Sequence, residues 1–378
     1  MKNSPIALML LMLLVTVSIL ASNALGDISL QYQWTLTTSP TTSGSFLYLN
    51  DNVKNGNLMA GKIGTGVFEI NRSGSFVNSI YTNTASVFGG SIGAMSAASM
   101  GDNIYIGKTP NTYGDASTGG IYRFDATGPN AWNTSSLVEV RDTDGNRIGA
   151  DSLTTNGTYL FTTITNSSDP SFNGDSHQDR VTAYSLNASN QLVQQWQTDV
   201  GSNKSIYGLS YGGNGYVYGV DAADGGTGTI WAFDAGTGTA TALASYRSPG
   251  TDRWNFYTPG AGTFGTAVDG DWLYIVGTGG YLSVFHLDTP ASLSGRQDFD
   301  IGADLIANGV QSPNKPVALT GVAADNNFLW IAFEADDDYD SPGMNHRVVG
   351  YLVPEPGTMA LLGLGGLGVL WRRRSRKA

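Results

Sequence analysis

A short segment recurs six times along this chain, and the repeat restricts the fold more than any other feature of the sequence. Each copy is a Gly, Asn or Asp turn followed by a strand of aromatic and aliphatic residues. The copies occupy residues 56–60, 102–106, 157–161, 215–218, 271–275 and 327–331. Matching positions are Met59, Tyr105, Leu160, Val217, Leu273 and Leu329, which lie 46, 55, 57, 56 and 56 residues apart. A regular period of this size, built from short strands, fits the blades of a β-propeller, about 40–50 residues each and extended here by longer loops.

Three further strands can be assigned around each repeat. A strand of small residues precedes each copy, as an innermost strand beside a crowded central channel requires; these strands are 45–50, 92–99, 150–155, 206–211, 263–268 and 319–324. Third strands follow at 66–70, 121–125, 181–186, 230–234, 282–287 and 348–352. Fourth strands follow at 76–81, 137–141, 193–199, 241–246 and 297–301, and the sixth copy lacks one.

The missing strand is predicted at the other end of the chain. Residues 31–36 precede the first complete copy and resemble the fourth strand at 193–198, with Trp34 in the place of Trp196. If residues 31–36 pair with the last copy, the ring closes without an open edge. The sequence therefore predicts an all-β, six-bladed propeller closed by an N-terminal strand. Seven blades and a β-sandwich stay open as alternatives, although a sandwich gives no reason for a period near 56.

Composition limits what the body can bind. The chain has 378 residues with 50 glycines and no cysteine, so disulfides, thiolate metal sites and cysteine nucleophiles are excluded. Without Lys2, Glu355 and the five cations of the tail, the body has 14 Lys and Arg against 30 Asp and Glu. This balance disfavours nucleic acid and anionic surfaces as partners.

The two ends of the chain carry targeting features. A basic start, an apolar run at 6–20 and small residues at 21–26 predict a signal peptide at 1–26, followed by a body at 27–353. The tail at 354–378 begins Pro354-Glu355-Pro356, continues with an almost uncharged run at 359–371 and ends in an arginine-rich cluster. The cluster favours the cytoplasmic side of a membrane.

This tripartite tail resembles the PEP-CTERM sorting signal of exported proteins in Gram-negative bacteria. The resemblance implies that Pro354, Glu355 and Pro356 form the element that an exosortase recognises. It also implies an exported protein of the cell envelope or the extracellular matrix. A short C-terminal membrane helix would anchor this protein transiently in the inner membrane until the tail is processed.

Propeller geometry places the longer connections on one face, and the candidate sites lie in them. Asp142, Asp144 and Asn146 resemble the start of a calcium loop, with the alternative of an Asx-rich turn. Trp254, Phe256 and Tyr257 are candidates for stacking on sugar rings, and Tyr113 and Trp132 are further aromatics near these loops.

Two functions stay open from the sequence. The first is a non-catalytic propeller that binds a polysaccharide or a protein; the second is an extracytoplasmic hydrolase or lyase acting on carbohydrate. Acids for the second would come from Asp169, Asp175, Asp336 or Asp338, and the catalytic residues are unknown. The chain has three histidines and no compact nucleophile motif, which favours binding. Residues 230–238 resemble a turn of quinoprotein-like blades, but a quinone enzyme needs more of its site than one turn. No cofactor is therefore predicted apart from calcium.

Overall fold

The computed structural model describes the strands of the body and the connections between many of them. It describes residues 28–37, 47–48, 53–54, 56–62, 66–81, 94–108, 119–150, 152–163, 180–201, 206, 208–221, 226–250, 263–311, 317–334 and 346–353. These residues belong to two compact units. Tyr32–Gly350 forms one unit; 1–31 and 351–378 form the other, in which 28–31 and 351–353 are described.

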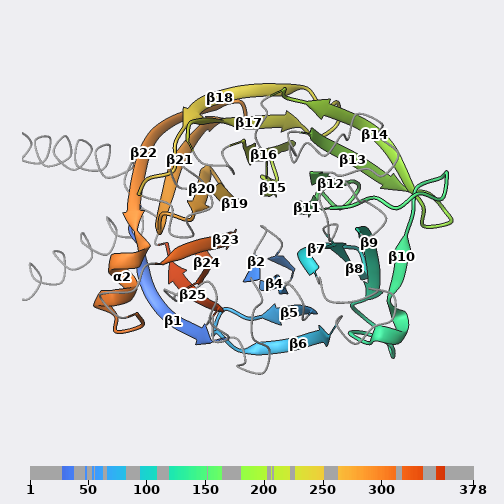
Figure 1. The fold of residues 1–378 in the computed structure, drawn as a ribbon, viewed down its shortest axis with the longest axis horizontal. Coiled ribbons are helices and arrows are strands. Elements are labelled where there is room, and N and C mark those ends of the chain that lie inside the picture. Colours follow the sequence, from blue (N-terminus) through green and yellow to red (C-terminus); the bar gives the residue numbers. More distant parts are fainter. Residues whose placement is uncertain are drawn as a thin grey trace, which may run out of the picture. The chain divides into compact units, whose positions relative to one another are not determined.

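The described residues of Tyr32–Gly350 form six β-sheets arranged in a ring (Figure 1). The first three blades run from the inside outward as follows: β2 Leu47–Tyr48, β4 Asn57–Lys62, β5 Gly66–Ile70 and β6 Phe76–Tyr81; β7 Ala94–Met100, β8 Asn103–Lys108, β9 Gly120–Asp125 and β10 Val138–Val140; β11 Ser152–Thr155, β12 Leu160–Thr163, β13 Arg180–Leu186 and β14 Leu192–Asp199. The fourth and fifth are β15 Leu209–Tyr211, β16 Tyr216–Val220, β17 Gly228–Asp234 and β18 Ala240–Tyr246; then β19 Thr263–Asp269, β20 Trp272–Gly277, β21 Tyr281–Thr289 and β22 Ser292–Asp300. The sixth is β23 Ala318–Asp325, β24 Phe328–Glu334, β25 His346–Leu352 and β1 Gln31–Thr37.

This topology confirms the six-bladed propeller and its closure by the N-terminal strand. β1 is the outermost strand of the sixth sheet, next to β25, although the two strands lie at opposite ends of the sequence. The β-sandwich and the seven-bladed alternatives are both wrong. A short extra strand, β3 Val53–Lys54, pairs with β4 and makes the inner strand of the first blade discontinuous.

The structure shifts the register of the sequence repeat by one residue in the first two blades. The tight turns put Asn57, Asn103, Trp272 and Phe328 at equivalent positions, opposite the last residue of the preceding strand. The matching residues are therefore Leu58 and Ile104 rather than Met59 and Tyr105, and the first two spacings become 46 and 56. The remaining four positions, from Leu160 to Leu329, keep their match.

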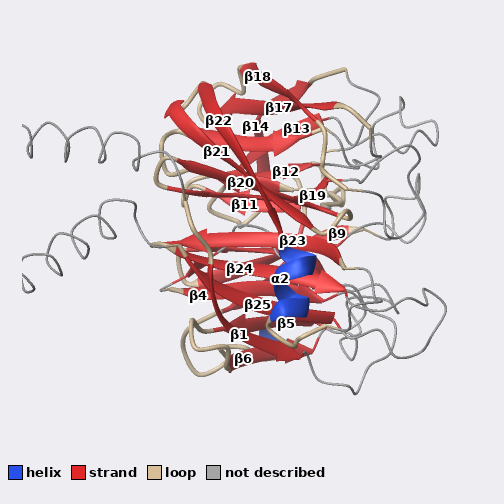
Figure 2. Cartoon of the chain, turned by 90° about the vertical axis from the view of Figure 1, so that its left-hand side faces the viewer, coloured by secondary structure: helices blue, strands red, loops and turns tan. Residues whose placement is uncertain are grey.

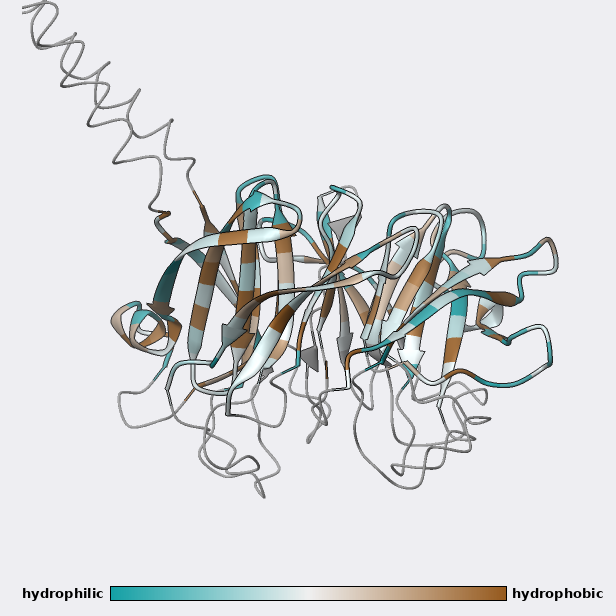
Figure 3. Cartoon of the chain, turned by 90° about the horizontal axis from the view of Figure 1, so that it is seen from above, coloured by the Kyte–Doolittle hydropathy of each residue, from teal (hydrophilic) through white to brown (hydrophobic). Residues whose placement is uncertain are grey.

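Blades pack against each other through the second strands. In each pair, a large side chain of one blade lies in the same hydrophobic cluster as the matched residue of the next blade, because neighbouring residues of a strand point to opposite faces. The pairs are Trp330 with Leu58, Met59 with Ile104, Tyr105 with Leu160, Phe161 with Val217, and Tyr218 with Leu273. Along the strands, Figure 3 shows apolar segments interrupted by polar ones. The core is thus divided into layers between the blades.

Small residues allow the inner strands to approach each other at the centre. A Cβ atom on Gly208 would lie 2.7 Å from the Cα of Gly265, and one on Gly265 would lie 2.9 Å from the Cα of Gly321. Side chains add bonds across the same boundary, since the hydroxyl of Thr266 donates to the carbonyl of Gly208 over 3.2 Å. The prediction of a small-residue inner strand is therefore confirmed, and its reason is backbone-to-backbone contact.

The closing strand is fixed by Trp34. Its indole N–H donates to the carbonyl of Arg72 over 2.6 Å, and its ring stacks on Phe328 with centroids 6.1 Å apart. Trp196 makes the same kind of contact in the third blade, where its N–H donates to the carbonyl of Ala235 over 3.1 Å. The similarity between residues 31–36 and 193–198 thus reflects one structural role, in which a fourth strand fastens its blade to the turn of the next.

Two features of the fifth blade differ from the sequence prediction. Strand β22 begins at Ser292, five residues before the predicted start, and it is followed by helix α2, Ile301–Ala307, where a loop was predicted. The helix is visible beside the strands in Figure 2. Asp300 caps it by accepting the N–H of Ala303 over 2.8 Å, and Ile301 and Leu305 are buried.

Candidate functional site: the loop face and its basic cluster

The two faces of the ring differ in the length of their connections. Connections from a second to a third strand, and from one blade to the next, all leave the same face because the strands within each blade are antiparallel. This surface, the loop face, carries the connections 109–119, 164–179, 335–345, 247–262 and 301–317. The opposite surface, the turn face, carries turns of about two to five residues, with the longer segment 126–137 as the exception. The predicted asymmetry of loop lengths is confirmed.

Charged side chains are buried at the loop-face ends of three second strands. Lys108 ends β8, Asp221 follows β16 and Glu334 ends β24, and their exposed fractions are 4%, 2% and 4%. These three are the buried charged residues of the part of the chain that the structure describes. Charged residues are rarely so deeply buried, and they concentrate at functional or specifically paired positions.

Asp221 is held by its own connection. One carboxylate oxygen accepts the backbone N–H of Thr229, and the other accepts the indole N–H of Trp231 over 2.9 Å. Both carboxylate oxygens accept hydrogen bonds from residues at the end of the β16–β17 connection. Asp221 therefore holds the two ends of that connection together.

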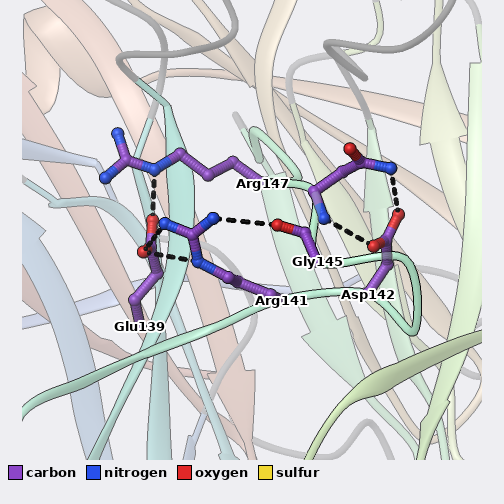
Figure 4. A network of polar contacts seen from close by, with 6 residues as sticks. Glu139, Arg141, Asp142, Gly145 and Arg147 are labelled. Carbon is purple, nitrogen blue, oxygen red and sulfur yellow. Dashed lines mark hydrogen bonds and ion pairs between the residues drawn. The ribbon is translucent and has the colours of Figure 1, made fainter.

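Lys108 lies close enough to Arg147 and Glu139 to feel their charges. Figure 4 shows Glu139 with the two arginines beside it, Arg141 and Arg147. Glu139 of β10 lies between two arginines: its Oε2 accepts from Nε and Nη2 of Arg141 over 2.9 and 2.6 Å, and its Oε1 lies 2.5 Å from Nε of Arg147. The N–H of Ala150 donates to the carbonyl of Lys108 over 3.5 Å, which brings the β10–β11 connection back to the end of β8. We call Lys108, Glu139, Arg141 and Arg147 the basic cluster.

The charges of the basic cluster act on one another. Burial lowers the pKa of Lys108, and the nearby Arg147 lowers it further, while Glu139 acts in the opposite direction. Burial also raises the pKa of Tyr122, with Glu139 adding to the effect and both arginines opposing it. Tyr122 is the cross-strand neighbour of Glu139, so its ring forms part of the same site.

The cluster lies at the boundary between the first two blades. Lys108 shares a face of β8 with Ile104 and Ile106, since alternate residues of a strand point the same way. Ile104 and Ile106 pack with Met59 and Val67 of the first blade. The exposed fractions of the Arg141 and Arg147 side chains are 45% and 34%, so these two guanidinium groups reach solvent.

The predicted calcium residues form a turn next to this cluster. One oxygen of Asp142 accepts the N–H groups of Asp144 and Asn146 over 2.9 and 2.7 Å, and the other accepts the side-chain amide of Asn146 over 3.1 Å. Arg141 binds the carbonyl of Gly145 over 2.8 Å. This geometry is that of the Asx-rich turn. Within the described ranges, no group of three or more His, Asp or Glu could hold a metal ion.

Most other predicted site residues lie outside the described residues. These are Trp254, Phe256, Tyr257, Tyr113, Asp169, Asp175, Asp336 and Asp338, and also Pro354, Glu355 and Pro356. Trp132 is described, and its predicted place near the long loops is wrong. It lies in the β9–β10 connection of the turn face and packs edge-on against Phe124 with centroids 5.2 Å apart.

Two polar groups on the turn face have structural roles. The His286 ring and the Ser294 hydroxyl both bind the same oxygen of Asp288, so the serine donates to the carboxylate and not to the imidazole. This arrangement differs from that of a catalytic triad. In the turn that resembles quinoprotein-like blades, Asp234 accepts the N–H groups of Gly236 and Thr237 over 2.9 and 2.8 Å. The aspartate therefore shapes that turn.

Sequence reasoning missed the basic cluster as a site. None of Lys108, Glu139, Arg141 and Arg147 was among the candidate site residues. The sequence sign that could have revealed Lys108 is a charged residue at the end of an apolar strand, as in Ile104-Tyr105-Ile106-Gly107-Lys108.

Fold and site together define a six-bladed β-propeller with an elaborated loop face. Among solved structures, the PQQ-bound aldose sugar dehydrogenase from Streptomyces coelicolor is similar, with a TM-score of 0.52, 13% identity, and coverage of 87% of this chain and 99% of that one. At this identity the likeness shows the fold alone. Raptor from Chaetomium thermophilum has a TM-score of 0.46 at 9% identity, covering 89% of this chain and 30% of that one. The computationally designed Ika4 protein has a TM-score of 0.34 at 13% identity, covering 56% and 96%. No curated protein sequence matches the chain.

The C-terminal residues show that the protein carries a sorting signal. Residues 352–374 match the PEP-CTERM protein-sorting motif. The protein is therefore an exported propeller that is sorted through the membrane, and it is a substrate for recognition by an exosortase. The described residues include no helix with the length and apolar character needed to cross a membrane. The predicted membrane segment and the signal peptide lie outside the described residues.

Proposed function

We propose that this exported protein is a non-catalytic binding module of the cell surface or extracellular matrix. Its loop face takes up a glycan or a protein ligand. The observation that carries this proposal is the position of Lys108 and Glu334, two buried charged residues that end second strands at that face. Deeply buried charged residues are rare and concentrate at functional or specifically paired positions, so two of them at one end of the ring support a ligand-related role there.

Aromatic residues of the same face would contribute to a glycan site. Trp254, Phe256 and Tyr257 belong to the β18–β19 connection, and their flat rings suit stacking on sugars. Trp254→Ala should then weaken glycan binding without changing the thermal midpoint. Trp132→Ala, on the turn face, is the matched control and should leave binding unchanged.

Binding and catalysis can be separated with one set of polysaccharides. The protein, purified in detergent with its tail intact, is first tested on a glycan array and then incubated with each glycan that binds. A binding module retains the glycan unchanged. Release of reducing ends or of unsaturated uronic acids would replace the proposal with the alternative of a hydrolase or lyase, for which Asp169, Asp175, Asp336 and Asp338 are the candidate acids.

Calcium remains a separate proposal for Asp142, Asp144 and Asn146. Oxygen donors at alternate positions support it, whereas the N–H groups already on Asp142 and the neighbouring Arg141 oppose it. If calcium binds there, a chelator should lower the thermal midpoint of the wild-type protein and not that of Asp144→Asn. An equal midpoint with and without chelator would exclude a structural role for the ion.

A further inference from the structure

We propose that the exosortase, while it holds the sorting motif, also docks on an apolar strand edge of the first blade at the turn face. The docking surface is formed by Phe76 and Val77, the first two residues of β6. It lies on the opposite side of the ring from the loop face, so this docking is independent of the ligand proposed there.

The sorting motif leaves the ring at the turn face. β25 is a third strand, and third strands run from the loop face to the turn face. The motif starts at residue 352, two residues after Gly350 of β25. Pro354 follows Gly350 by four residues, a reach of at most about 14 Å. Even a domain of about 100 residues has a radius of gyration of about 13 Å. An enzyme that holds residues 354–356 must therefore approach the turn face of the sixth blade.

Trp34 places the first blade directly beside this exit. A Cβ atom on Gly350 would lie 2.6 Å from Cε2 of the indole, and one on Gly74 would lie 3.0 Å from the same atom. Gly350 and Gly74 therefore lie against the same ring, although they belong to different blades. Gly74 is part of the turn between β5 and β6, and Phe76 follows it by two residues. In Figure 1, β6 is accordingly the outer strand that follows β1 around the ring.

Phe76 and Val77 expose apolar surface at this point. Their exposed fractions are 41% and 46%, and the described residues include two further exposed large hydrophobics, Val138 and Leu352. Within the described sheet, β6 is the outermost strand and pairs with β5 alone. Proteins commonly place charged side chains on such open edges to prevent association with another chain. Strand β6 contains no charged residue, so its edge favours a partner.

The charges around this surface are already used within the fold. Arg72 of the preceding turn pairs with Asp325 of the sixth blade. Glu69 of β5 accepts the side-chain amides of Asn57 and Asn78. The docking surface therefore attracts its partner through apolar side chains and an open strand edge rather than through charge.

The exosortase is the partner that this position favours. The motif brings it to the turn face, and its contact with residues after β25 would continue onto the neighbouring turn and strand of the first blade. Other occupants meet repulsion, because the body carries 14 Lys and Arg against 30 Asp and Glu. A second copy of the body and an anionic lipid surface are both disfavoured by this excess of negative charge.

Substitution by threonine tests the docking surface in the full-length protein. Threonine is β-branched and suits a strand, and it offers less apolar surface. The rate of tail processing is measured by mass spectrometry in membranes that contain the exosortase of the producing organism. Covering two nearly half-exposed apolar side chains corresponds to at least about a tenfold gain in affinity. Phe76→Thr/Val77→Thr should therefore be processed at least about tenfold more slowly than the wild type at limiting enzyme.

Val138→Thr is the matched control. Val138 has an exposed fraction of 42% and begins the outer strand of the second blade, one blade further from the exit. This variant should be processed at the wild-type rate. An unchanged rate in the double variant, or an equal loss in Val138→Thr, would overturn the proposal. Thermal midpoints check that the variants fold.

A spacer distinguishes docking from obstruction. Ten Gly and Ser residues inserted between Val353 and Pro354 have an r.m.s. span of about 16–19 Å and let the enzyme hold the motif away from the first blade. If Phe76 and Val77 assist the enzyme, the spacer should slow processing of the wild-type protein toward the rate of the threonine variant. Faster processing with the spacer would mean that the body hinders the enzyme, which is the opposite of the proposal.

Photocrosslinking identifies the occupant even where a substitution impairs folding. A photo-reactive benzoylphenylalanine in place of Phe76 should give, on illumination of the same membranes, an adduct that contains exosortase peptides. The same group in place of Val138 should not give this adduct. An adduct of the Phe76 position with lipid, with a second copy of the protein or with residues 354–378 of its own chain, and not with the exosortase, would contradict the assignment.

Discussion

Replacing Trp34 by alanine tests whether the N-terminal strand closes the ring. The side chain joins the sixth blade to the first: it stacks on Phe328 of the sixth blade, and it contacts Gly74 and the carbonyl of Arg72 in the first. A Cβ atom on Gly350 would lie 2.6 Å from the indole, so the ring also lies directly on β25. No other residue type fills this space and also supplies the donor for Arg72.

The magnitude follows from these contacts. A fully buried Trp→Ala change costs about 3–5 kcal/mol, and Trp34 is partly buried, so the lower part of this range applies. Loss of the indole hydrogen bond adds about 1 kcal/mol. We expect a total near 3–4 kcal/mol. For a body of 327 residues, an unfolding entropy of about 2.1 cal/mol/K per residue converts this loss into a fall of about 4–6 °C in the thermal midpoint.

A double-mutant cycle distinguishes the specific contact from general damage. Gly350→Ala should destabilise the wild-type protein because its new methyl group meets both the indole and the ring of Phe328. It should cost less in the Trp34→Ala background, where only the contact with Phe328 is left. Trp196→Ala is the control for an equivalent tryptophan within a blade that does not close the ring. The thermal midpoint is measured by circular dichroism. A midpoint of Trp34→Ala within about 1 °C of the wild type, or additive effects in the cycle, would refute the closure by Trp34.

Three further perturbations address other parts of the fold. Deleting residues 354–378 should leave the thermal midpoint unchanged, because β1 supplies the fourth strand of the last blade; a marked loss of stability would contradict this. Gly265→Val should lower the unfolding free energy by at least about 2 kcal/mol, since the new side chain meets the backbone of Gly321. Gly236→Ala is the control and should be close to neutral, because its Cβ would lie 3.5 Å from its nearest neighbour, Oδ1 of Asp234. Hydrogen bonds from Thr237 and Gly236 lower the pKa of Asp234, so its contribution is present at neutral pH and is lost as the pH falls through this lowered pKa. Urea unfolding of Asp234→Asn should therefore differ from the wild type at pH 7 and converge with it at low pH, and a constant difference would exclude the linkage.

The ring could be predicted from the sequence because the period of the repeat can be read without knowing the exact register of each strand. Turns of Gly, Asn and Asp mark each blade, and β1 was recognised through Trp34 and its likeness to Trp196. The register of the repeat was off by one residue in the first two blades. Met59 was matched instead of Leu58, since both residues are apolar and both faces of the strand are buried between blades. Strand β22 was underestimated because an outermost strand is largely exposed and lacks an apolar pattern. Helix α2 could have been predicted from two features of the sequence: Asp300 is a capping residue, and Ile301 and Leu305 have the spacing of one helix face.

The site could be predicted less well than the fold. Asp142, Asp144 and Asn146 were read as possible ligands from their spacing, and the structure shows how the N–H groups of the turn already occupy the Asp142 oxygens. The basic cluster draws on β8, on β10 and on the connection after β10. Its residues become neighbours through the pairing of β8 and β9 and of β9 and β10, and burial of Lys108 can be seen only when the first blade is in place.

Closure by β1 also explains why the sorting motif can begin where it does. The motif matches residues 352–374, and β25 ends at Leu352, so the sheet and the motif meet at one residue. In the other five blades, the third strand is followed along the chain by a fourth strand. Because the last blade takes its fourth strand from the N-terminal side, the residues after β25 are not needed to complete the sheet. The long separation between Trp34 and Phe328 has a cost in folding rate, since contacts between distant residues form slowly. In return, the segment recognised by the exosortase follows a sheet that is already complete, and we expect its processing to leave the six sheets unchanged.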